Sequence, residues 1–203
     1  MKILDERRSP NPRRVRVFLA EKGIEVPFEQ VDIMTGAAKS PAFTAHNPVQ
    51  RVPVLILDDG TAISESMAIC RYFEALQPEP PLFGTTPLEI AQIEMWNRRA
   101  EINFMLPVTQ IFRHSHPAMA ELEKPQVAAW AEANRPRVNE IIHIFDEALK
   151  KTPFLAGDRF SVADITAMIT TDFMKPARLA IPESAVNFQR WYQEVSIRPS
   201  HKA

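Results

Sequence analysis

The apolar positions near the start of the chain change their spacing from one short segment to the next. Residues 2–5 (KILD) predict a short strand, and residues 12–22 predict a helix whose apolar side chains share one face before Gly23 ends it. A second strand is expected around residues 26–33. These three segments together predict a βαβ unit.

A second group of elements follows an irregular, proline-containing link. Residues 54–57 and 61–63 flank the turn Asp58-Asp59-Gly60, which is the pattern of a β-hairpin. A helix is expected to begin near Ser64. The first part of the chain is therefore predicted to be an α/β domain with the order βαβ, then ββα.

The segment 77–87 (QPEPPLFGTTP) is rich in proline, which prevents regular structure. We predict a first domain of residues 1–77, a linker of residues 78–87 and a second domain of residues 88–203. Apolar residues in the second domain recur at helical spacing, which predicts an all-α domain. Its predicted helical segments are 88–114, 125–151 and 161–179, the last opened by a capping box of Ser161 and Asp164.

Composition places the chain among ordinary globular proteins. Its 203 residues are 45% hydrophobic and 24% charged, with a formal net charge of −1. No apolar run approaches the ~18 residues of a membrane span, and the start of the chain lacks the apolar region of a secretory signal. The single cysteine, Cys70, excludes an internal disulfide and a CxxC motif. We expect a cytoplasmic protein that does not associate with membranes.

Histidine spacing argues against a metal site. His114 and His116 lie close together, but no carboxylate nearby is placed as a third ligand. We therefore expect no metal site. As a separate expectation, the chain has no bound cofactor.

The segment 9–15 (SPNPRRV) lies between the first strand and the first helix. Proline favours the first helical position, so Pro12 there would make Asn11 the N-cap. The free N–H groups and positive dipole end of such a helix favour an anion or a thiolate above Ser9 and Asn11. No cysteine lies there, so a thiolate would come from a ligand. The alternative is that these residues only cap the helix.

Five arginines lie in or near this segment and would attract a polyanionic small molecule. Because the chain is neutral overall and shows no other basic stripe, we expect no nucleic-acid partner. The five are Arg7, Arg8, Arg13, Arg14 and Arg16.

Two further segments suggest groups that bind a small peptide. A cis proline at position 53 would leave the N–H and C=O of Val52 free to pair with an extended ligand, whereas a trans proline at a strand edge is the alternative. The Ser66 hydroxyl and the nearby N–H groups suit a carboxylate, and Glu65 suits an ammonium group. Simple helix capping is the alternative for Glu65 and Ser66.

The three segments, in this order, resemble the N-terminal domain of the cytosolic glutathione transferase superfamily. The phrases concerned are SPNPRRVRVFLAEKGI, NPVQRVPVLILDDG and ISESMAICRYFEA, and the resemblance continues through FLAGDRFSVADI and WYQEVSIRPS. It implies a thioredoxin-like first domain followed by an all-helical domain, a homodimer and a role in detoxification. Glutathione would be a co-substrate, and a small hydrophobic electrophile would be its partner.

The resemblance also implies how glutathione is held. Val52 would bind the cysteinyl backbone beside cis Pro53, Glu65 and Ser66 would hold the γ-glutamyl end, and Lys39 would reach the glycyl carboxylate. The residues assigned to glutathione, including two that would assist, are Lys39, Gln50, Arg51, Val52, Pro53, Glu65 and Ser66.

The electrophile pocket would be walled by the first helix of the second domain. Phe104, Val108 and Phe112 recur there at four-residue spacing, although the same spacing is typical of a plain core. His114 and His116, further along the same segment, are also assigned to this pocket.

The catalytic group departs from the family pattern, because no tyrosine or cysteine follows the first strand. Ser9 and Asn11 remain as candidates, and Ser-Pro-Asn resembles a bacterial subgroup with Thr-Pro-Asn whose asparagine donates to the sulfur. The chain also resembles the yeast-type branch, in which polar groups of the helical domain act through a water. His114, Ser115 and His116 would take that role, unless they simply end a solvated helix.

We therefore predict a glutathione transferase that conjugates the glutathione thiolate to electrophilic small molecules. A glutathione-dependent disulfide reductase or peroxidase is one alternative, and without a site cysteine it would need a second glutathione. A non-catalytic binding or scaffold module of the same fold is the other alternative.

Overall fold

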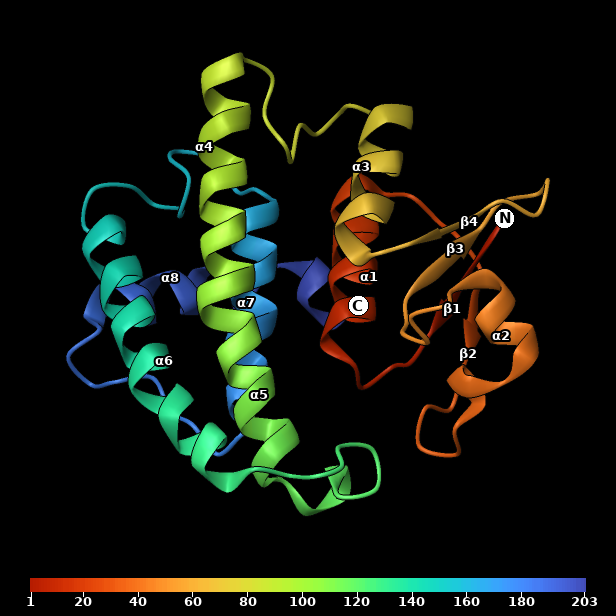
Figure 1. Ribbon diagram of the computed structural model, residues 1–203. Coiled ribbons are helices and arrows are strands. Elements are labelled where there is room, and N and C mark those ends of the chain that lie inside the picture. Colours follow the sequence, from red (N-terminus) through yellow and green to blue (C-terminus); the bar gives the residue numbers. More distant parts are fainter. The chain divides into compact units, whose positions relative to one another are not determined.

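The computed structural model describes residues 1–203 and divides into two compact units (Figure 1). One contains Met1–Pro81 and Pro199–Ala203, and the other contains Leu82–Arg198. The prediction of 78–87 as a linker and 88–203 as the second domain differs from this division at both ends. The buried amine of Lys22 donates to the carbonyls of Gln77, Pro78 and Pro80 at 2.8, 3.0 and 2.6 Å, which ties residues 77–80 to the first unit.

The last residues of the chain also belong to the first unit. Arg13 donates to the carbonyl of His201 at 2.8 Å, and the Ser200 hydroxyl donates to Glu21. These contacts explain why the short helix η4 (Pro199–Lys202) lies against the first helix rather than in the helical unit.

A four-stranded sheet in the order β2-β1-β3-β4 forms the centre of the first unit. β1 is parallel to β2 and antiparallel to β3, which is antiparallel to β4. This arrangement confirms the predicted α/β class and its order βαβ, then ββα. The strands are β1 (Lys2–Asp5), β2 (Phe28–Gln30), β3 (Val54–Ile56) and β4 (Ala62–Ser64).

Alternating side chains give the sheet two buried faces. Leu4 and Val54 pack with Ala38 and Phe43, which come from η1 (Ala37–Lys39) and α2 (Pro41–His46). Their neighbours in the strands point the other way and are also fully buried. α1 (Pro10–Lys22) and α3 (Ser66–Leu76) pack against each other (Figure 1).

The helix α2 was not predicted, because its segment reads as an irregular, proline-containing link. Ser40 caps it by accepting a hydrogen bond from the Phe43 N–H at 3.2 Å, and Pro41 occupies the first helical position. The pair Ser40-Pro41 is a sequence signal for a helix start, and the prediction missed it.

The helix α1 begins two residues earlier than predicted. Its N-cap is Ser9, not Asn11, and the helix runs from Pro10 to Lys22 before Gly23 ends it in the left-handed conformation at φ 64°. Proline fits anywhere in the first turn, where its missing N–H leaves no bond unmade. Both Pro10 and Pro12 are therefore accommodated, and Asn11 lies inside the first turn.

The second unit contains no sheet, as predicted, and its helices surround an aromatic core. The ring centroids of Phe104 lie 5.7 Å from Phe145 and 6.1 Å from Phe188, which in turn lies 5.0 Å from Trp191. The predicted helix 88–114 is three consecutive segments, of which the middle one is a π-helix. The helices are α4 (Pro87–Arg98), the π-helix η2 (Arg99–Met105), α5 (Leu106–Ser115), η3 (Pro117–Met119), α6 (Ala128–Leu149), α7 (Val162–Met174) and α8 (Val186–Ser196).

The predicted capping box at Ser161 and Asp164 is present and fully buried. Asp164 also accepts hydrogen bonds from the Leu155 N–H at 3.0 Å and from the Trp191 indole at 2.9 Å. One carboxylate thus joins three segments of this unit. None of its helices, nor any in the first unit, combines the length and apolar character needed to cross a membrane.

Candidate functional site

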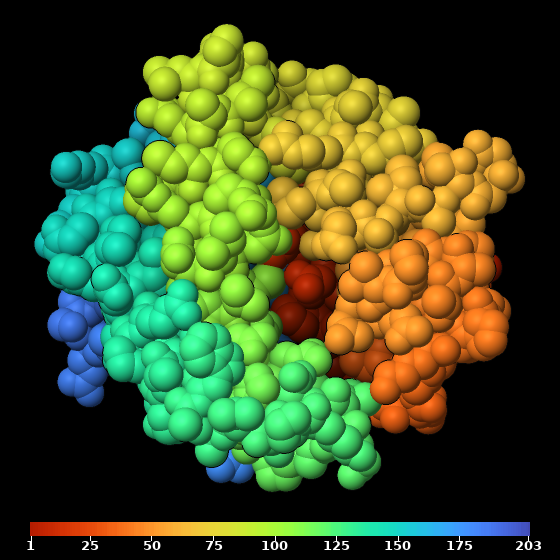
Figure 2. Space-filling model, in the orientation of Figure 1, coloured from red at the N-terminus to blue at the C-terminus, as the bar shows by residue number.

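The predicted glutathione residues gather at one end of the sheet. Leu4 lies opposite Val54, and Val54 lies opposite Ser64. The residues after β1, before β3 and after β4 therefore emerge at the same end, which brings Ser9, Val52 and Glu65 together. In the space-filling view, segments 37–50 and 61–76 form adjoining parts of one face, and the start of the chain reaches the surface beside them (Figure 2).

The Val52–Pro53 peptide bond is cis, as predicted. The N–H and C=O of Val52 make no hydrogen bond within the chain, although the residue is half-buried. Asn47, itself buried, donates to the Arg51 carbonyl at 2.8 Å and so holds the loop before this bond. Val52 therefore offers one donor and one acceptor to an extended ligand.

Two site residues have a backbone conformation that is uncommon outside glycine. Gln50 has φ 59° and Glu65 has φ 70°, and only one other non-glycine residue in the chain has positive φ. Such conformations cost about 1–3 kcal/mol each and cluster at functional sites. Their coincidence with the predicted site is independent support for it.

The acidic and hydroxyl groups at the start of α3 differ in exposure. The Glu65 carboxylate is exposed and has no partner in the chain. Ser66 is only 6% exposed, and its Oγ accepts a hydrogen bond from the Arg14 guanidinium at 3.2 Å. An acceptor bond to Arg14 leaves the Ser66 proton available for a ligand carboxylate.

The two residues that could stabilise a thiolate at the start of α1 differ in their hydrogen bonds. The Ser9 hydroxyl donates to Glu6 Oε2 at 2.6 Å. Asn11 is exposed, and neither its side-chain amide nor its N–H has a partner in the chain. Because Pro10 and Pro12 lack N–H groups and the Arg13 N–H donates to the Ser9 carbonyl at 3.3 Å, Asn11 carries the free backbone donor of this first turn.

Glu6 is a residue that the sequence analysis missed. It is 6% exposed and also accepts from Arg8 Nε at 2.9 Å. Burial tends to raise the pKa of Glu6, but the hydrogen bonds from Ser9 and Arg8 outweigh it and lower the pKa below its ordinary value. Its position three residues before Ser9 was the available signal, since a turn brings such residues together.

The predicted basic cluster is not one surface. Arg14 is fully buried, and Arg16 donates to Asp5 at 2.5 Å. Arg14 falls at four-residue spacing with Phe18 and Lys22, which are also buried, so its burial was readable from the helix period. The cluster therefore does not attract ligands as a group, and Arg14 acts on Ser66 instead.

The remaining predicted glutathione residues lie in the loops at the same end. Lys39 ends η1, is exposed and has a free amine. The Gln50 amide donates to Thr44 Oγ1 at 3.3 Å, and Arg51 donates to the Gln50 carbonyl at 3.1 Å. The assignments of these residues to glutathione remain predictions.

Two of the residues predicted to wall the electrophile pocket are too deeply buried to do so. Phe104 and Val108 have no exposed surface, and Phe104 belongs to the aromatic core of the second unit. Side chains without exposed surface do not line a pocket. Only Phe112 is partly exposed, and its ring lies 5.0 Å from Phe173 and 4.6 Å from His116.

The histidines near the end of α5 have structural partners. His114 Nδ1 accepts from the Val127 N–H at 3.1 Å, and its Nε2 lies 3.1 Å from Gln110 Oε1. His116 Nδ1 accepts from the Ala118 N–H at 3.2 Å, and the Ser115 hydroxyl donates to the Ile111 carbonyl. These bonds favour the helix-end explanation. The side chains that bind metals form no cluster of three.

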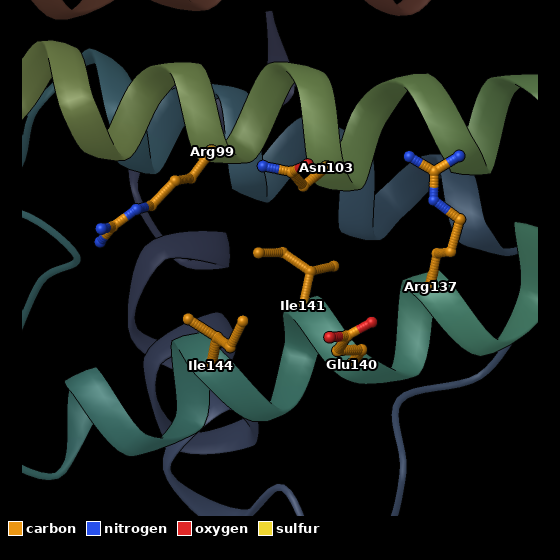
Figure 3. Close-up of a pocket in the computed structure, with 6 residues that line it drawn as sticks. All are labelled: Arg99, Asn103, Arg137, Glu140, Ile141 and Ile144. Atoms are coloured by element: carbon orange, nitrogen blue, oxygen red, sulfur yellow. The ribbon is translucent and has the colours of Figure 1, made fainter.

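A groove of about 350 Å³ lies elsewhere in the second unit, between η2 and α6 (Figure 3). Arg99 and Arg137 lie at its two ends, and neither pairs with a carboxylate of this chain. Ile141 and Ile144 form its apolar side (Figure 3). None of the predicted site residues lines this groove.

Comparisons with known proteins agree with this geometry. Residues 8–76 match the glutathione S-transferase N-terminal domain, and residues 102–199 match the C-terminal domain. The chain is 40% identical to glutathione S-transferase 2 of Saccharomyces cerevisiae over 205 aligned positions, covering 100% of this chain and 88% of that one.

Solved structures give the same result. Gtt2 of S. cerevisiae superposes with a TM-score of 0.95 at 40% identity, covering 100% of this chain and 99% of that one. A glutathione S-transferase domain-containing protein of Marinobacter aquaeolei also has a TM-score of 0.95 at 40% identity, covering 98% of this chain and 99% of that one.

Proposed function

The chain belongs to the glutathione S-transferase family and is a glutathione transferase, and we propose that the end of its sheet described above holds glutathione for attack on a small hydrophobic electrophile. The observation that carries this proposal is the free N–H and C=O of half-buried Val52 beside two residues of strained backbone. In this proposal glutathione is a co-substrate, no other cofactor takes part, and the role is detoxification in the cytoplasm.

The proposed binding mode matches each charged group of glutathione to a group at this end of the sheet. The free carboxylate of Glu65 pairs with the γ-glutamyl ammonium, and the Ser66 proton, turned outward by Arg14, donates to the adjacent carboxylate. Val52 pairs with the cysteinyl backbone, and the amine of Lys39 reaches the glycyl carboxylate. Gln50 and Arg51 assist from the loop.

The chemistry follows from the place of the cysteinyl sulfur above α1. An unperturbed thiol has a pKa of about 8.5, and the positive end of a helix with one or two donors lowers it toward neutrality. Asn11 supplies those donors from its amide and N–H. The thiolate then attacks the electrophile directly, without a covalent bond to the enzyme. With an aryl halide, a carbon–sulfur bond replaces the carbon–halogen bond and halide leaves.

The first experiment is calorimetric titration with glutathione, followed by assays with an aryl halide and with a small disulfide. Binding together with aryl-halide turnover supports the proposal. Turnover of the disulfide alone contradicts it and favours a reductase. For Asn11→Ala we expect a raised pKa of bound glutathione, measured from the ultraviolet absorbance of the thiolate.

The proposal includes a homodimer in which the groove of Figure 3 is part of the interface. Its arginines lack acidic partners, and the adjacent Ile102 and Ile144 are 40% and 42% exposed. A second copy would cover this apolar surface and supply carboxylates. Sedimentation equilibrium should give twice the chain mass, and Ile144→Glu should give a monomer. Ile197→Glu, at a position 83% exposed on the end of α8, is the matched control that should remain dimeric.

A further inference from the structure

The Ser9 hydroxyl has one proton, and it donates that proton in a hydrogen bond to Glu6. Ser9 Oγ lies 2.6 Å from Glu6 Oε2, and the Ser9 N–H donates to the Glu6 carbonyl at 3.0 Å. The second oxygen of this buried carboxylate accepts from Arg8 Nε at 2.9 Å. An ionised carboxylate only accepts hydrogen bonds, so the bond between these two side chains runs from Ser9 to Glu6.

We propose, on the basis of the function proposed above, that Glu6 is a positioning residue that turns the Ser9 proton away from the glutathione sulfur and leaves Asn11 as the thiolate donor. Ser9 then presents only lone pairs to the sulfur, which do not stabilise an anion. The negative charge of Glu6 also opposes a nearby thiolate, although Arg8 partly neutralises it. Asn11, with free donors on its side chain and backbone, carries neither disadvantage.

The hydrogen bond from Arg8 makes it possible to reverse the direction of the Ser9–Glu6 hydrogen bond by a mutation of Glu6. In Glu6→Gln, the Arg8 Nε–H favours the amide oxygen as its acceptor, because the amide nitrogen is a donor. The amide nitrogen then takes the position of Oε2 and donates to Ser9 Oγ. The Ser9 proton is thereby turned outward, where it reaches a thiolate.

The experiment compares the pKa of bound glutathione in four proteins: unaltered, Glu6→Gln, Ser9→Ala and the double variant. A hydrogen bond to a charged group changes such a pKa by about one unit. We expect Glu6→Gln to lower the pKa by about one unit when Ser9 is present, and by less than half of that when Ser9 is replaced. Loss of the Glu6 charge alone would lower the pKa equally in both backgrounds, and that result overturns the proposal.

Two further proteins complete the design. Glu6→Asp keeps the charge but withdraws the carboxylate from Ser9, so it should also lower the pKa in a Ser9-dependent way, and it serves if Glu6→Gln does not fold. Glu25→Gln removes an exposed carboxylate and should leave the pKa unchanged. Unaltered protein that fails to bind glutathione overturns the proposed function together with this inference. Binding with a shift independent of Ser9 overturns the role of Glu6 alone.

Discussion

The Arg14 guanidinium on α1 donates a hydrogen bond to the Ser66 hydroxyl on α3 across 3.2 Å, and both side chains are buried. This bond connects the helix that would face the sulfur with the residue that would hold the γ-glutamyl carboxylate. It also places a positive charge beneath that carboxylate. Arg14 is therefore expected to support glutathione binding through Ser66.

Arg14→Lys tests this relationship, because lysine keeps the charge but loses the planar fork of donors. We expect the dissociation constant for glutathione to rise roughly tenfold in calorimetry, a loss typical of one hydrogen bond to a charged group. Ser66→Ala should add little to the effect, since both changes remove the same interaction. A half-buried arginine on α6, changed in Arg135→Lys, is the control. Equal effects of the two lysine variants would contradict the role of Arg14.

The free carboxylate of Glu65 predicts selectivity for one end of the ligand. Glu65→Gln should weaken glutathione binding roughly tenfold, because a charge-assisted hydrogen bond to the ammonium is lost. An analogue of glutathione that lacks this amino group should bind the variant and the unaltered protein with the same affinity. Calorimetry with both ligands checks this. A similar loss for both ligands would show that Glu65 acts only on the fold.

Cys70 is expected to be inert in the native protein. It is fully buried, and burial raises the pKa of its thiol to about 12, against the opposing charge of Arg14. Only about one molecule in ten thousand would carry the thiolate at pH 8. A chromogenic disulfide reagent should therefore react no faster than the protein unfolds, and should react at once in denaturant. Rapid reaction with native protein would contradict this prediction and would make the Cys70 thiol a candidate for disulfide chemistry.

Glu89 predicts a component of stability that is lost in acid. It accepts hydrogen bonds from the Thr85 N–H, the Thr85 hydroxyl and the Thr86 N–H, which lower its pKa to about 2. A lowered pKa stabilises the folded state above the ordinary value of 4.5, and this contribution disappears as the pH falls toward 2. Urea unfolding of Glu89→Gln should therefore show a deficit at pH 7 that shrinks as the pH falls below 4.5. Glu25→Gln, at an exposed carboxylate, is the control, and a deficit constant with pH would contradict the prediction.

Local pattern was sufficient for much of the fold and for part of the site. The strand at residues 2–5, the hairpin around Asp58-Asp59-Gly60 and the capping box at Ser161 were predicted where the structure has them, because their signals lie within a few residues. The cis bond before Pro53 was implied by the family resemblance, because the segment alone left cis and trans open. The predicted start of α1 was wrong by two residues, because Pro10 and Pro12 can each occupy the first helical position and the prediction chose Pro12.

The sequence by itself determined the order of most elements and the division into an α/β and an all-α part, since each depends on neighbours in the chain. The assignment of residues to glutathione remains a prediction. Only the tertiary structure decided what those residues contact. Phe104 is buried in the core, Arg14 donates a hydrogen bond to Ser66, and the Ser9 hydroxyl donates a hydrogen bond to Glu6. The reason is physical: periodicity shows which face of an element is apolar, whereas the direction of a hydrogen bond depends on partners that folding brings within 3 Å or so.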